Sequence, residues 1–528
     1  MKICAVRRFV IGRSLSSFTE NLTLANFVNG AYRRGGGNEC GVESPSDGQV
    51  FASIRLSTQA DVDEAVCAAR QAQDHVWSKT TLETRARLLR SLAEALVEQQ
   101  LRFAQLDSVS GGLCLRDSTA SVQSSVRVLR QCADLLSRSC LGRSIGLSSI
   151  DCGNDPFSFT LRRGPVGTVG LITPFNYPLE MGIWKIAFAL AAGNSVVWKP
   201  PIETPLSGAL LASVAHAVGI PPGVLNVVHG GRETGTMLCR HPSIGLIGFT
   251  GSTATGAAVQ RQCAEGKGAL KRCLLELGGS APLLVHDSAD LNVAVDIALH
   301  AFYHSGQSCT AVRRAYVPRS QLSQFLELIV QRLLVHRVGH ALDPSVQQGP
   351  LINALALERA LQAILAAVKT QGSKVVCGAF RIPQWKEGYY MAPTVVVHDE
   401  AHHDEPLVQD EHFAPLLIVI PYSGTWSDAI RLANASPFGL SCNVVAVSEP
   451  AIEEAMRALE AGTVWVNGAD VMDGTTPFGG WKQSGFGKDL GLAGLSEYTT
   501  LKTVIGPRAT MQKLVDTTTP NHAQVVDS

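Results

Sequence analysis

Strand-like and helix-like segments alternate through the middle of the chain, and this order restricts the fold more than any other feature of the sequence. Short apolar runs predict buried strands at residues 166–173, 195–199, 224–228, 246–249 and 314–317. Longer stretches predict helices at residues 60–72, 82–100, 178–192, 205–218, 291–303 and 321–335. Such alternation predicts an α/β fold with parallel sheets.

The composition favours a folded protein with a small-molecule partner. A length of 528 residues suggests about two to four domains. The 45 Lys and Arg residues balance 45 Asp and Glu residues, which argues against nucleic acid as the main partner. No uninterrupted apolar run reaches the roughly 18 residues of a transmembrane helix, so we expect no membrane span.

The chain contains 13 cysteines. They include no C-x-x-C pair and no Cys/His cluster with zinc-ligand spacing, so we expect neither a disulfide scaffold nor a metal site. We interpret most of them as small core residues of a reduced intracellular protein. One of them can still be reactive.

The N-terminal residues 1–19 are basic and rich in serine, and the first acid is Glu20. This composition is typical of a mitochondrial transit peptide, which we place at residues 1–22; an untargeted basic N-terminus is the alternative. The expected location is therefore the mitochondrial matrix or the cytoplasm. At the other end, residues 508–528 are polar and predict a loose tail.

Cys309 is the best candidate for a nucleophile. It follows a predicted helix in a polar, glycine-containing loop and precedes an apolar strand, so its thiol can face a cleft. A catalytic thiol also needs a base and donors for an oxyanion. Glu276 lies in an apolar stretch that ends in Gly278 and Gly279, and such surroundings raise a carboxyl pKa toward that of a general base. A buried structural glutamate is the alternative.

Three further polar positions lie at the ends of predicted strands. The amide of Asn176 could donate to an oxyanion, or the residue could cap the helix that follows. The turn at residues 251–256 opens a helix, and its backbone N–H groups could hold a phosphate. Lys199 closes a strand, where it could reach a nucleotide crevice or remain a solvated charge.

Eight short motifs follow one another across nearly the whole chain. They are PFNYP at 174–178, GIPPGV at 219–224, FTGST at 249–253, ELGG at 276–279, GQSC at 306–309, GPLIN at 349–353, FAP at 413–415 and PFGG at 477–480. In this order and spacing, the sequence resembles the hydrolytic, non-acylating members of the NAD(P)-dependent aldehyde dehydrogenase superfamily.

The resemblance implies a role for each candidate. Cys309 would attack the aldehyde carbon, Asn176 and the Cys309 N–H would hold the oxyanion, and Glu276 would activate the water that hydrolyses the thioester. Hydride would pass to the nicotinamide of NAD, with NADP possible. Cofactor contacts would come from Thr173, Pro174, Lys199, Gly235, Gly251, Ser252, Glu411 and Phe413.

The resemblance also implies a domain organisation. A Rossmann-type cofactor domain would comprise residues 23–143 and 166–276, and an α/β catalytic domain would comprise residues 277–485. A bridging hairpin at 144–165 and a C-terminal segment at 486–507, with a strand at 495–504, would form a small β element. This element would join the subunits of a homodimer or homotetramer.

The sequence departs from the family pattern near the expected adenosine ribose. The family usually has an acid three residues after the strand-end lysine, whereas this chain has Ile202 there and Glu203 one place later. Loss of the acid removes a contact that favours NAD and a charge that repels a 2′-phosphate. NADP use is therefore more open than usual. Ser280 and Ala414 also depart from the pattern, without removing a catalytic group.

The helix after Asn176 presents a possible substrate surface. Four of its side chains share one face at helical spacing: Tyr177, Glu180, Met181 and Trp184. The resemblance places this face, with Phe478, along the substrate tunnel, and Asp470 and Asp473 near its mouth. Aromatic rings with a carboxylate could hold a cation, as in members that oxidise amino- or trimethylammonio-aldehydes. Glu180 could instead point outward.

Two other functions stay open. A CoA-acylating relative would release an acyl-CoA, but such relatives usually lack a base at the position of Glu276. A structural or binding protein could keep the fold without turnover; the presence of Cys309, Glu276 and Asn176 argues against it.

Overall fold

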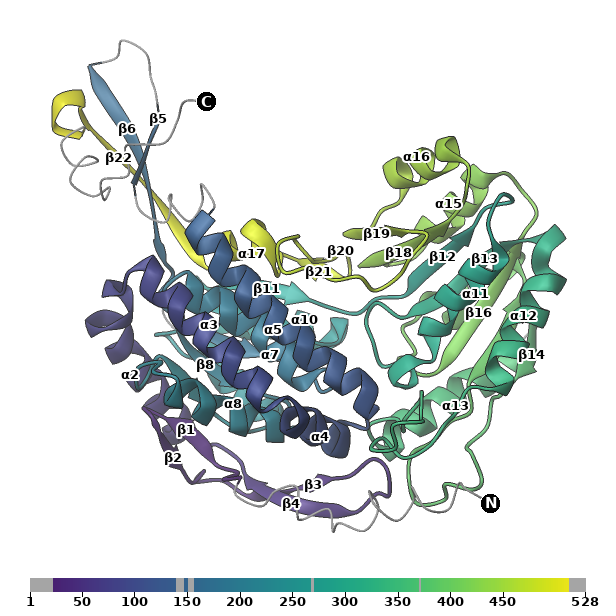
Figure 1. The fold of residues 1–528 in the computed structure, drawn as a ribbon, viewed down its shortest axis with the longest axis horizontal. Coiled ribbons are helices and arrows are strands. Elements are labelled where there is room, and N and C mark those ends of the chain that lie inside the picture. The colour runs from purple at the N-terminus through teal and green to yellow at the C-terminus, as the bar shows by residue number, and fades with distance from the viewer. Residues whose placement is uncertain (1–21, 139–146, 151–155, 267–269, 370–371, 512–528) are drawn as a thin grey trace.

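The computed structural model describes residues 22–138, 147–150, 156–266, 270–369 and 372–511. Two large sheets lie side by side, each covered by helices, and a narrow three-stranded sheet projects from one of them (Figure 1). Most of the predicted transit peptide and most of the predicted tail lie outside the described residues.

The first sheet has eight strands in the order β2-β1-β9-β8-β7-β10-β11-β21. Their bounds are β1 (Asn26–Val28), β2 (Ala31–Arg33), β7 (Thr168–Ile172), β8 (Ser195–Lys199), β9 (Leu225–Val227), β10 (Leu246–Thr250), β11 (Arg272–Glu276) and β21 (Gly485–Phe486). The strands from β9 to β11 run parallel, which confirms the predicted α/β class. Their order reverses between β7 and β10, and a doubly wound sheet opens a ligand crevice at such a point.

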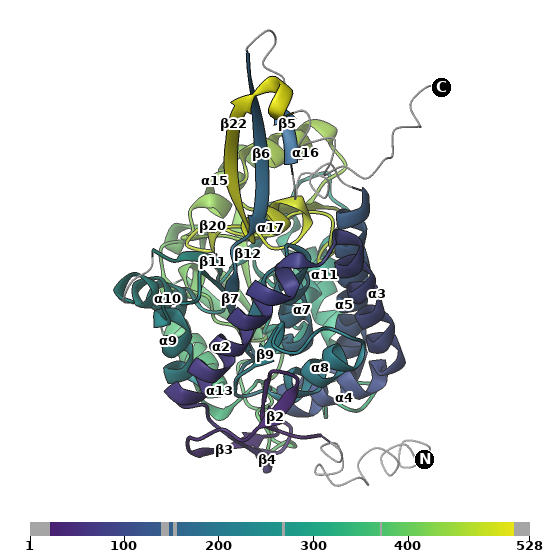
Figure 2. The same ribbon diagram turned by 90° about the vertical axis from the view of Figure 1, so that its left-hand side faces the viewer.

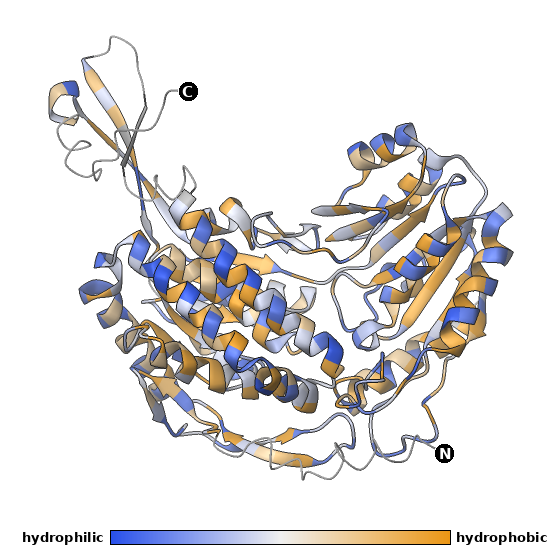
Figure 3. Ribbon diagram, viewed as in Figure 1, coloured by the Kyte–Doolittle hydropathy of each residue, from blue (hydrophilic) through white to orange (hydrophobic). Residues whose placement is uncertain are grey.

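Helices cover both faces of this sheet. Val196 and Trp198 of β8 pack into a core formed mainly by five helices, whereas Val197 between them packs into a core formed by three helices on the other face, as alternation along a strand requires. The first group is α3 (Leu82–Glu98), α4 (Gln100–Gly111), α5 (Leu115–Arg138), α7 (Pro178–Ala191) and α8 (Leu206–Ala217). The second is α2 (Gln59–His75), α9 (Arg232–Arg240) and α10 (Thr253–Glu265). Figure 3 shows the apolar strands inside and mixed helix surfaces outside.

The second sheet has seven strands in the order β14-β15-β16-β13-β12-β18-β19, parallel except for the edge strand β14. The bounds are β12 (Ala281–Val285), β13 (Val312–Pro318), β14 (Ser373–Cys377), β15 (Thr394–His398), β16 (Leu416–Tyr422), β18 (Ser441–Val445) and β19 (Thr463–Val466). One face packs against α11 (Leu291–Ala298) and α12 (Leu322–Leu334). The other packs against α13 (Ala354–Val368), α14 (Pro406–Gln409), α15 (Trp426–Asn434) and α16 (Glu449–Ala458).

The projecting sheet contains the predicted bridging hairpin, β5 (Leu147–Ile150) and β6 (Phe157–Pro165), and β22 (Thr499–Pro507) pairs with β6 over its whole length (Figure 2). The prediction of a strand from residue 495 is wrong at its start, because α17 (Gly491–Glu497) precedes β22. A short hairpin, β3 (Glu39–Glu43) with β4 (Val50–Arg55), and a short antiparallel pair of distant strands, β17 (Phe438–Gly439) with β20 (Trp481–Lys482), complete the strands.

Ten cysteines fall within the described residues, all as free thiols. Five of these are buried: Cys114, Cys132, Cys239, Cys263 and Cys442. The interpretation of most cysteines as core residues therefore holds for half of those described. In the same part of the chain, no helix is long and apolar enough to cross a membrane, and no group of three or more His, Cys, Asp or Glu side chains could hold a metal ion.

Candidate active site

Two cavities meet at Cys309. The tunnel cavity, of about 250 Å³, lies against α5 and α7 and is lined by Tyr177, Glu180, Met181, Trp184 and Phe478 among others. The strand-end cavity, of about 810 Å³, is lined by Pro174, Gly251, Ser252, Glu411 and Phe413 among others. Both are lined by Asn176, Met181, Thr250, Leu277 and Cys309. A thiol at this junction can react with a molecule in one cavity beside a molecule in the other.

A tight turn places the Cys309 loop. His304, Ser305 and Gly306 have φ angles of 49°, 52° and 67°, in the left-handed region. A Cβ on Gly306 would clash with the Ala414 carbonyl, so the close approach of these two loops requires glycine. Gln307 then ties the loop to a distant segment, because its Oε1 accepts from the Ile352 N–H at 2.8 Å. The GQSC and GPLIN motifs thus meet in space.

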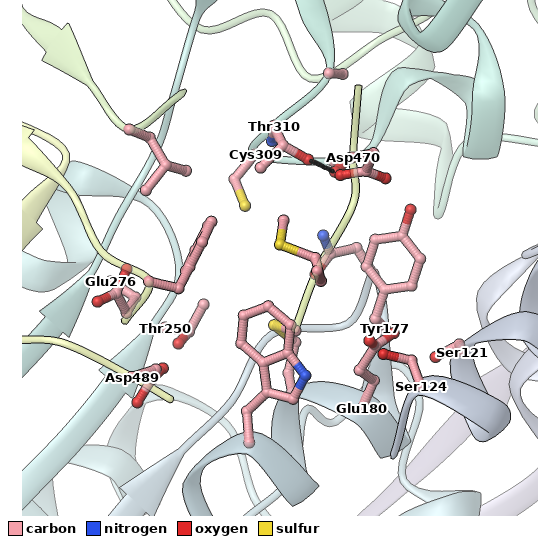
Figure 4. Close-up of a pocket in the computed structure, with 18 of the residues that line it drawn as sticks. Ser121, Ser124, Tyr177, Glu180, Thr250, Glu276, Cys309, Thr310, Asp470 and Asp489 are labelled. Carbon is pink, nitrogen blue, oxygen red and sulfur yellow. Dashed lines mark hydrogen bonds between the residues drawn. The ribbon is translucent and has the colours of Figure 1, made fainter. Parts of the chain in front are cut away.

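The surroundings of Cys309 disfavour its thiolate. The residue is half-buried, and burial raises the pKa of its thiol well above the ordinary value. The carboxylates of Glu411, Asp470 and Glu276 raise that pKa further. Figure 4 shows Glu276 and Tyr177 on opposite sides of Cys309, with Asp470 hydrogen-bonded to Thr310 at 2.9 Å. A positive charge near the sulfur is therefore needed to form a nucleophile.

Asn176 lies between β7 and α7 and is buried. Its Nδ2 donates to the Gln307 carbonyl at 2.9 Å, which leaves a second N–H for a ligand. The alternative role of Asn176 as a helix cap is wrong, because Tyr177 occupies the N-cap of α7 and makes no side-chain cap bond. The amide is thus held beside the Cys309 loop.

Glu276 is the last residue of β11 and is buried. Burial raises the pKa of its carboxyl well above the ordinary value, and the neighbouring Asp489 raises it further. Asp489 is itself paired with the buried Lys185, whose Nζ lies 2.7 Å from the Asp489 Oδ2. A Cβ on Gly479 would lie 2.6 Å from the Glu276 Oε1, so the PFGG motif leaves room for this carboxylate.

The strand-end cavity follows the crevice between β7 and β10. Ser252, which lines this cavity, caps α10 and accepts from the Thr255 N–H at 3.3 Å, so the start of the helix, with its free N–H groups, borders the cavity. The Glu411 Oε1 accepts from the Gly279 N–H at 3.0 Å. Phe413 meets Phe175 edge-to-face, with ring centroids 5.9 Å apart. Helix-start N–H groups and a buried acceptor suit a phosphate and a ribose.

Three predicted cofactor residues, Thr173, Lys199 and Gly235, do not line this cavity. The Lys199 Nζ donates to the carbonyls of Pro200 and Gly230 at 3.1 and 3.0 Å, and burial lowers its pKa to about 8. The alternative of a solvated charge at Lys199 is therefore wrong. A Cβ on Gly235 would lie 3.8 Å from the Lys199 Cε, so Gly235 of α9 lies beside Lys199 at the end of β8.

Comparison with known proteins agrees with this geometry. The sequence profile described as "Aldehyde dehydrogenase family" matches residues 32–504. The chain belongs to the aldehyde dehydrogenase family. Aldehyde dehydrogenase 1A1 of Rattus norvegicus is 36% identical over 476 residues, which cover 89% of this chain and 91% of the relative. The Mus musculus protein of the same name is 36% identical over 487 residues, covering 90% and 94%.

Solved structures of aldehyde dehydrogenases share the fold. Betaine aldehyde dehydrogenase from Staphylococcus aureus, in complex with NAD+, has a TM-score of 0.88 at 30% identity and covers 93% of this chain and 96% of that one. The apo form of a mutant of that enzyme has a TM-score of 0.87 at 30% identity, covering 93% and 97%. The family resemblance noted in the sequence is thereby confirmed, while the roles of individual residues stay predictions.

Several tunnel residues of this aldehyde dehydrogenase were missed by sequence reasoning. α5 contributes Asp117, Ser121, Ser124 and Arg127 to the tunnel cavity. The spacing of 4, 3 and 3 residues along one helix face was the available signal. Asp470 lines the cavity as expected, whereas Asp473 does not and instead accepts from the Gln131 Nε2 at 2.9 Å.

Proposed function

We propose that this aldehyde dehydrogenase oxidises an aldehyde to a carboxylic acid, with NAD as hydride acceptor and Cys309 as nucleophile. The observation that carries the proposal is the position of Cys309 at the junction of two cavities. The overall reaction consumes one aldehyde, one NAD+ and one water, and yields a carboxylate, NADH and two protons. The tunnel cavity would hold the aldehyde, and the strand-end cavity would hold the nicotinamide end of the cofactor.

Each residue at or near the junction has a separate role in the chemistry. The Cys309 sulfur adds to the aldehyde carbon, and the Asn176 Nδ2 and the Cys309 N–H hold the oxygen as it becomes negative. Bound NAD supplies the hydride acceptor. Glu276 then takes a proton from the water that attacks the thioester, because a buried carboxylate with a raised pKa is a competent base. The buried ion pair of Asp489 and Lys185 lies near Glu276 and acts on its carboxyl electrostatically.

The residues of the strand-end cavity fit NAD. The start of α10 at Ser252 would hold the pyrophosphate, and Glu411 would accept from the ribose next to the nicotinamide. Near the adenosine end, Glu203 is exposed and attracts the Lys199 ammonium. An acid in this region disfavours a 2′-phosphate, so we place NAD before NADP.

A panel of aldehydes crossed with NAD and NADP tests the proposal through absorbance at 340 nm. We expect reduction of NAD that needs no CoA, and loss of more than about 10³-fold of the rate in Cys309→Ala. A strict requirement for CoA would favour the acylating alternative. Absence of reduction with every aldehyde, with and without CoA, would favour a binding protein.

A cationic aldehyde is a candidate for the substrate. Glu180 lines the tunnel cavity and is 8% exposed, so the alternative that it points outward is wrong. Asp117 and Asp470 line the same cavity and add negative charge to it, whereas Arg127 contributes a positive charge. The rings of Tyr177 and Trp184 lie on its wall and would add cation–π attraction. Hydrogen bonds from Ser124 and Ser121 favour the charged form of Glu180, although burial raises its pKa to about 7.

Replacement of Glu180 by Leu tests this candidate. We expect the KM of an aminoaldehyde to rise at least about tenfold, the equivalent of 1.4 kcal/mol, while the KM of an aliphatic aldehyde of equal length changes less than about twofold. Glu180→Gln, which keeps the shape, is the matched control for charge. Equal effects on both aldehydes would contradict a cation subsite.

A further inference from the structure

Arg313 is a buried charge for which the chemistry above has no use. It lies on β13, four residues after Cys309, and is 2% exposed. None of the ion pairs found among the described residues includes it. Burying a guanidinium without an ion-pair partner costs free energy, so the hydrogen bonds that Arg313 makes have to offset this cost.

An irregularity in the sheet directs this side chain. Val312 pairs with Ala281 of β12 and Arg314 pairs with Pro282, so Arg313 is an extra residue between two pairs. A bulge of this kind re-aims a side chain and is frequent beside active sites. Arg314 donates to the Ser280 carbonyl, whereas Arg313 reaches the loop that carries Cys309.

The Arg313 guanidinium joins two loops. Its Nη1 donates to the Ala414 carbonyl at 2.6 Å, and its Nη2 donates to the carbonyls of Gly306 and, at 3.4 Å, Ser308. Between them, the Gln307 carbonyl is held by Asn176. Side-chain donors therefore fix three consecutive carbonyls just before Cys309, and tie them to the segment that carries Glu411 and Phe413.

Fixing these carbonyls also fixes an amide. In a trans peptide the C=O and the following N–H point in opposite directions. Because the Ser308 carbonyl turns toward Arg313, the Cys309 N–H turns away from it. That N–H is one of the two donors assigned above to the oxyanion.

We propose that Arg313 is a positioning residue that holds the Ser308–Cys309 peptide in the orientation of an oxyanion donor and places a positive charge beside the Cys309 sulfur. This inference rests on the proposed function, because the orientation matters only if Cys309 is the nucleophile. Because Arg313 and the Cys309 thiol interact electrostatically, the charge of Arg313 would oppose the three carboxylates that disfavour the Cys309 thiolate.

The charge state of Arg313 is consistent with this role. Burial lowers the pKa of its guanidinium to about 10, while Glu411 and Cys309 raise it, so Arg313 stays charged at neutral pH. In turn, Arg313 opposes the rise that burial causes in the pKa of Glu411. One cation thus interacts electrostatically with the Cys309 thiol and with a predicted ribose-binding carboxylate.

The test compares Arg313→Gln and Arg313→Lys with Arg85→Gln. Arg85 is the matched control, since it is also buried, donates to the carbonyls of Trp77 and Ala191, and has its pKa lowered to about 10 by burial. The first readout is the rate of iodoacetamide alkylation at Cys309 against pH, without cofactor, followed by peptide mass spectrometry. The second is the separate effect on kcat and on KM for NAD.

We expect Arg313→Gln to shift the alkylation profile at least about one unit upward and to lower kcat at least about tenfold, with KM for NAD within about twofold. Arg313→Lys should restore the profile but not kcat, because one ammonium cannot hold the carbonyls in a planar fork. Arg85→Gln should change neither readout.

Three results would overturn the proposal. One is a wild-type alkylation profile in Arg313→Gln, and another is the same shift in Arg85→Gln. If Arg313→Gln does not fold, wild-type kcat in Arg313→Lys would be the third. Because alkylation needs no turnover, it still decides about Arg313 if the wild-type protein oxidises no aldehyde, so failure of the proposed function is distinguishable.

Discussion

At the scale of single residues, both reactive groups are held in environments that favour their neutral forms. Burial raises the pKa of the Cys309 thiol and of the Glu276 carboxyl, and nearby carboxylates add to each rise. Deprotonation of either group therefore depends on a positive charge that opposes these effects, such as Lys185 and Lys488 for Glu276. Activity should depend on pH through these two groups.

Glu276→Gln gives the residue-scale prediction. A base must be deprotonated to act, so wild-type turnover should rise with pH through the raised pKa of Glu276. The variant should lose this rise and slow hydrolysis by about 10²–10⁴-fold. Because hydride transfer precedes hydrolysis, a burst of one NADH per site should remain, with an acyl group on Cys309 detectable by mass spectrometry. An unchanged steady-state pH profile would contradict the role of Glu276 as base.

The reactive residues were more predictable than the groups that place them. Cys309, Glu276 and Asn176 stand in short motifs, and all three line the tunnel cavity. Arg313 had no such signal, because its direction depends on a bulge between two strands. The α5 wall of the tunnel had a signal in its helical spacing, but a face of polar residues is also typical of a solvent-exposed helix, so the spacing alone did not identify the cavity.

At the scale of elements, continuous apolar runs gave accurate bounds, and close contacts between distant segments did not. β8 begins and ends at the predicted residues, and α7 ends one residue early. The predicted helix at 291–303 instead ends at Ala298 and is followed by 3₁₀ turns. The later turn is held from outside by the Ser305 hydroxyl, which donates to the Gly349 carbonyl at 2.5 Å. Helix propensity depends on local residue types, so it could not predict a turn that depends on this distant contact.

The ion pair between α7 and the segment before α17 gives the element-scale prediction. Lys185 and Asp489 are 0% and 4% exposed, so Lys185→Met should lower the free energy of unfolding by about 3–5 kcal/mol by leaving a buried carboxylate unpaired. Lys185→Met with Asp489→Leu should lose less. Urea unfolding measures both. Arg457→Ala, which breaks an exposed pair with Glu453, should cost no more than about 1 kcal/mol.

If the double variant is as unstable as Lys185→Met alone, the pair is not what holds the two elements together. In that case the loss belongs to packing of the lysine chain rather than to its charge.

At the scale of the whole molecule, the three-stranded sheet of β5, β6 and β22 projects away from the two large sheets. Leu501 and Ile505 of β22 are 49% and 58% exposed. Apolar side chains on a sheet that extends from the body suit contact with another subunit. The homodimer or homotetramer stays a prediction, as does a location in the mitochondrial matrix or the cytoplasm.

Leu501→Lys combined with Ile505→Lys tests that contact. We expect the particle mass measured by light scattering to fall to that of one chain, because two buried charges would oppose association. Leu334→Lys with Val335→Lys, at exposed positions on and after α12, should leave the mass unchanged. A single-chain mass in the unaltered protein would contradict the proposed role of the sheet.

The junction of the two cavities has a consequence for inhibition. Five residues, among them Cys309, border both spaces, while most of each wall belongs to one space alone. An aldehyde analogue and a nucleotide analogue should therefore occupy the protein together rather than exclude each other. Linking two such compounds across the sulfur would raise affinity through effective concentration. The part of that compound in the tunnel cavity would distinguish this enzyme from other nucleotide-binding proteins, which a nucleotide analogue alone would not.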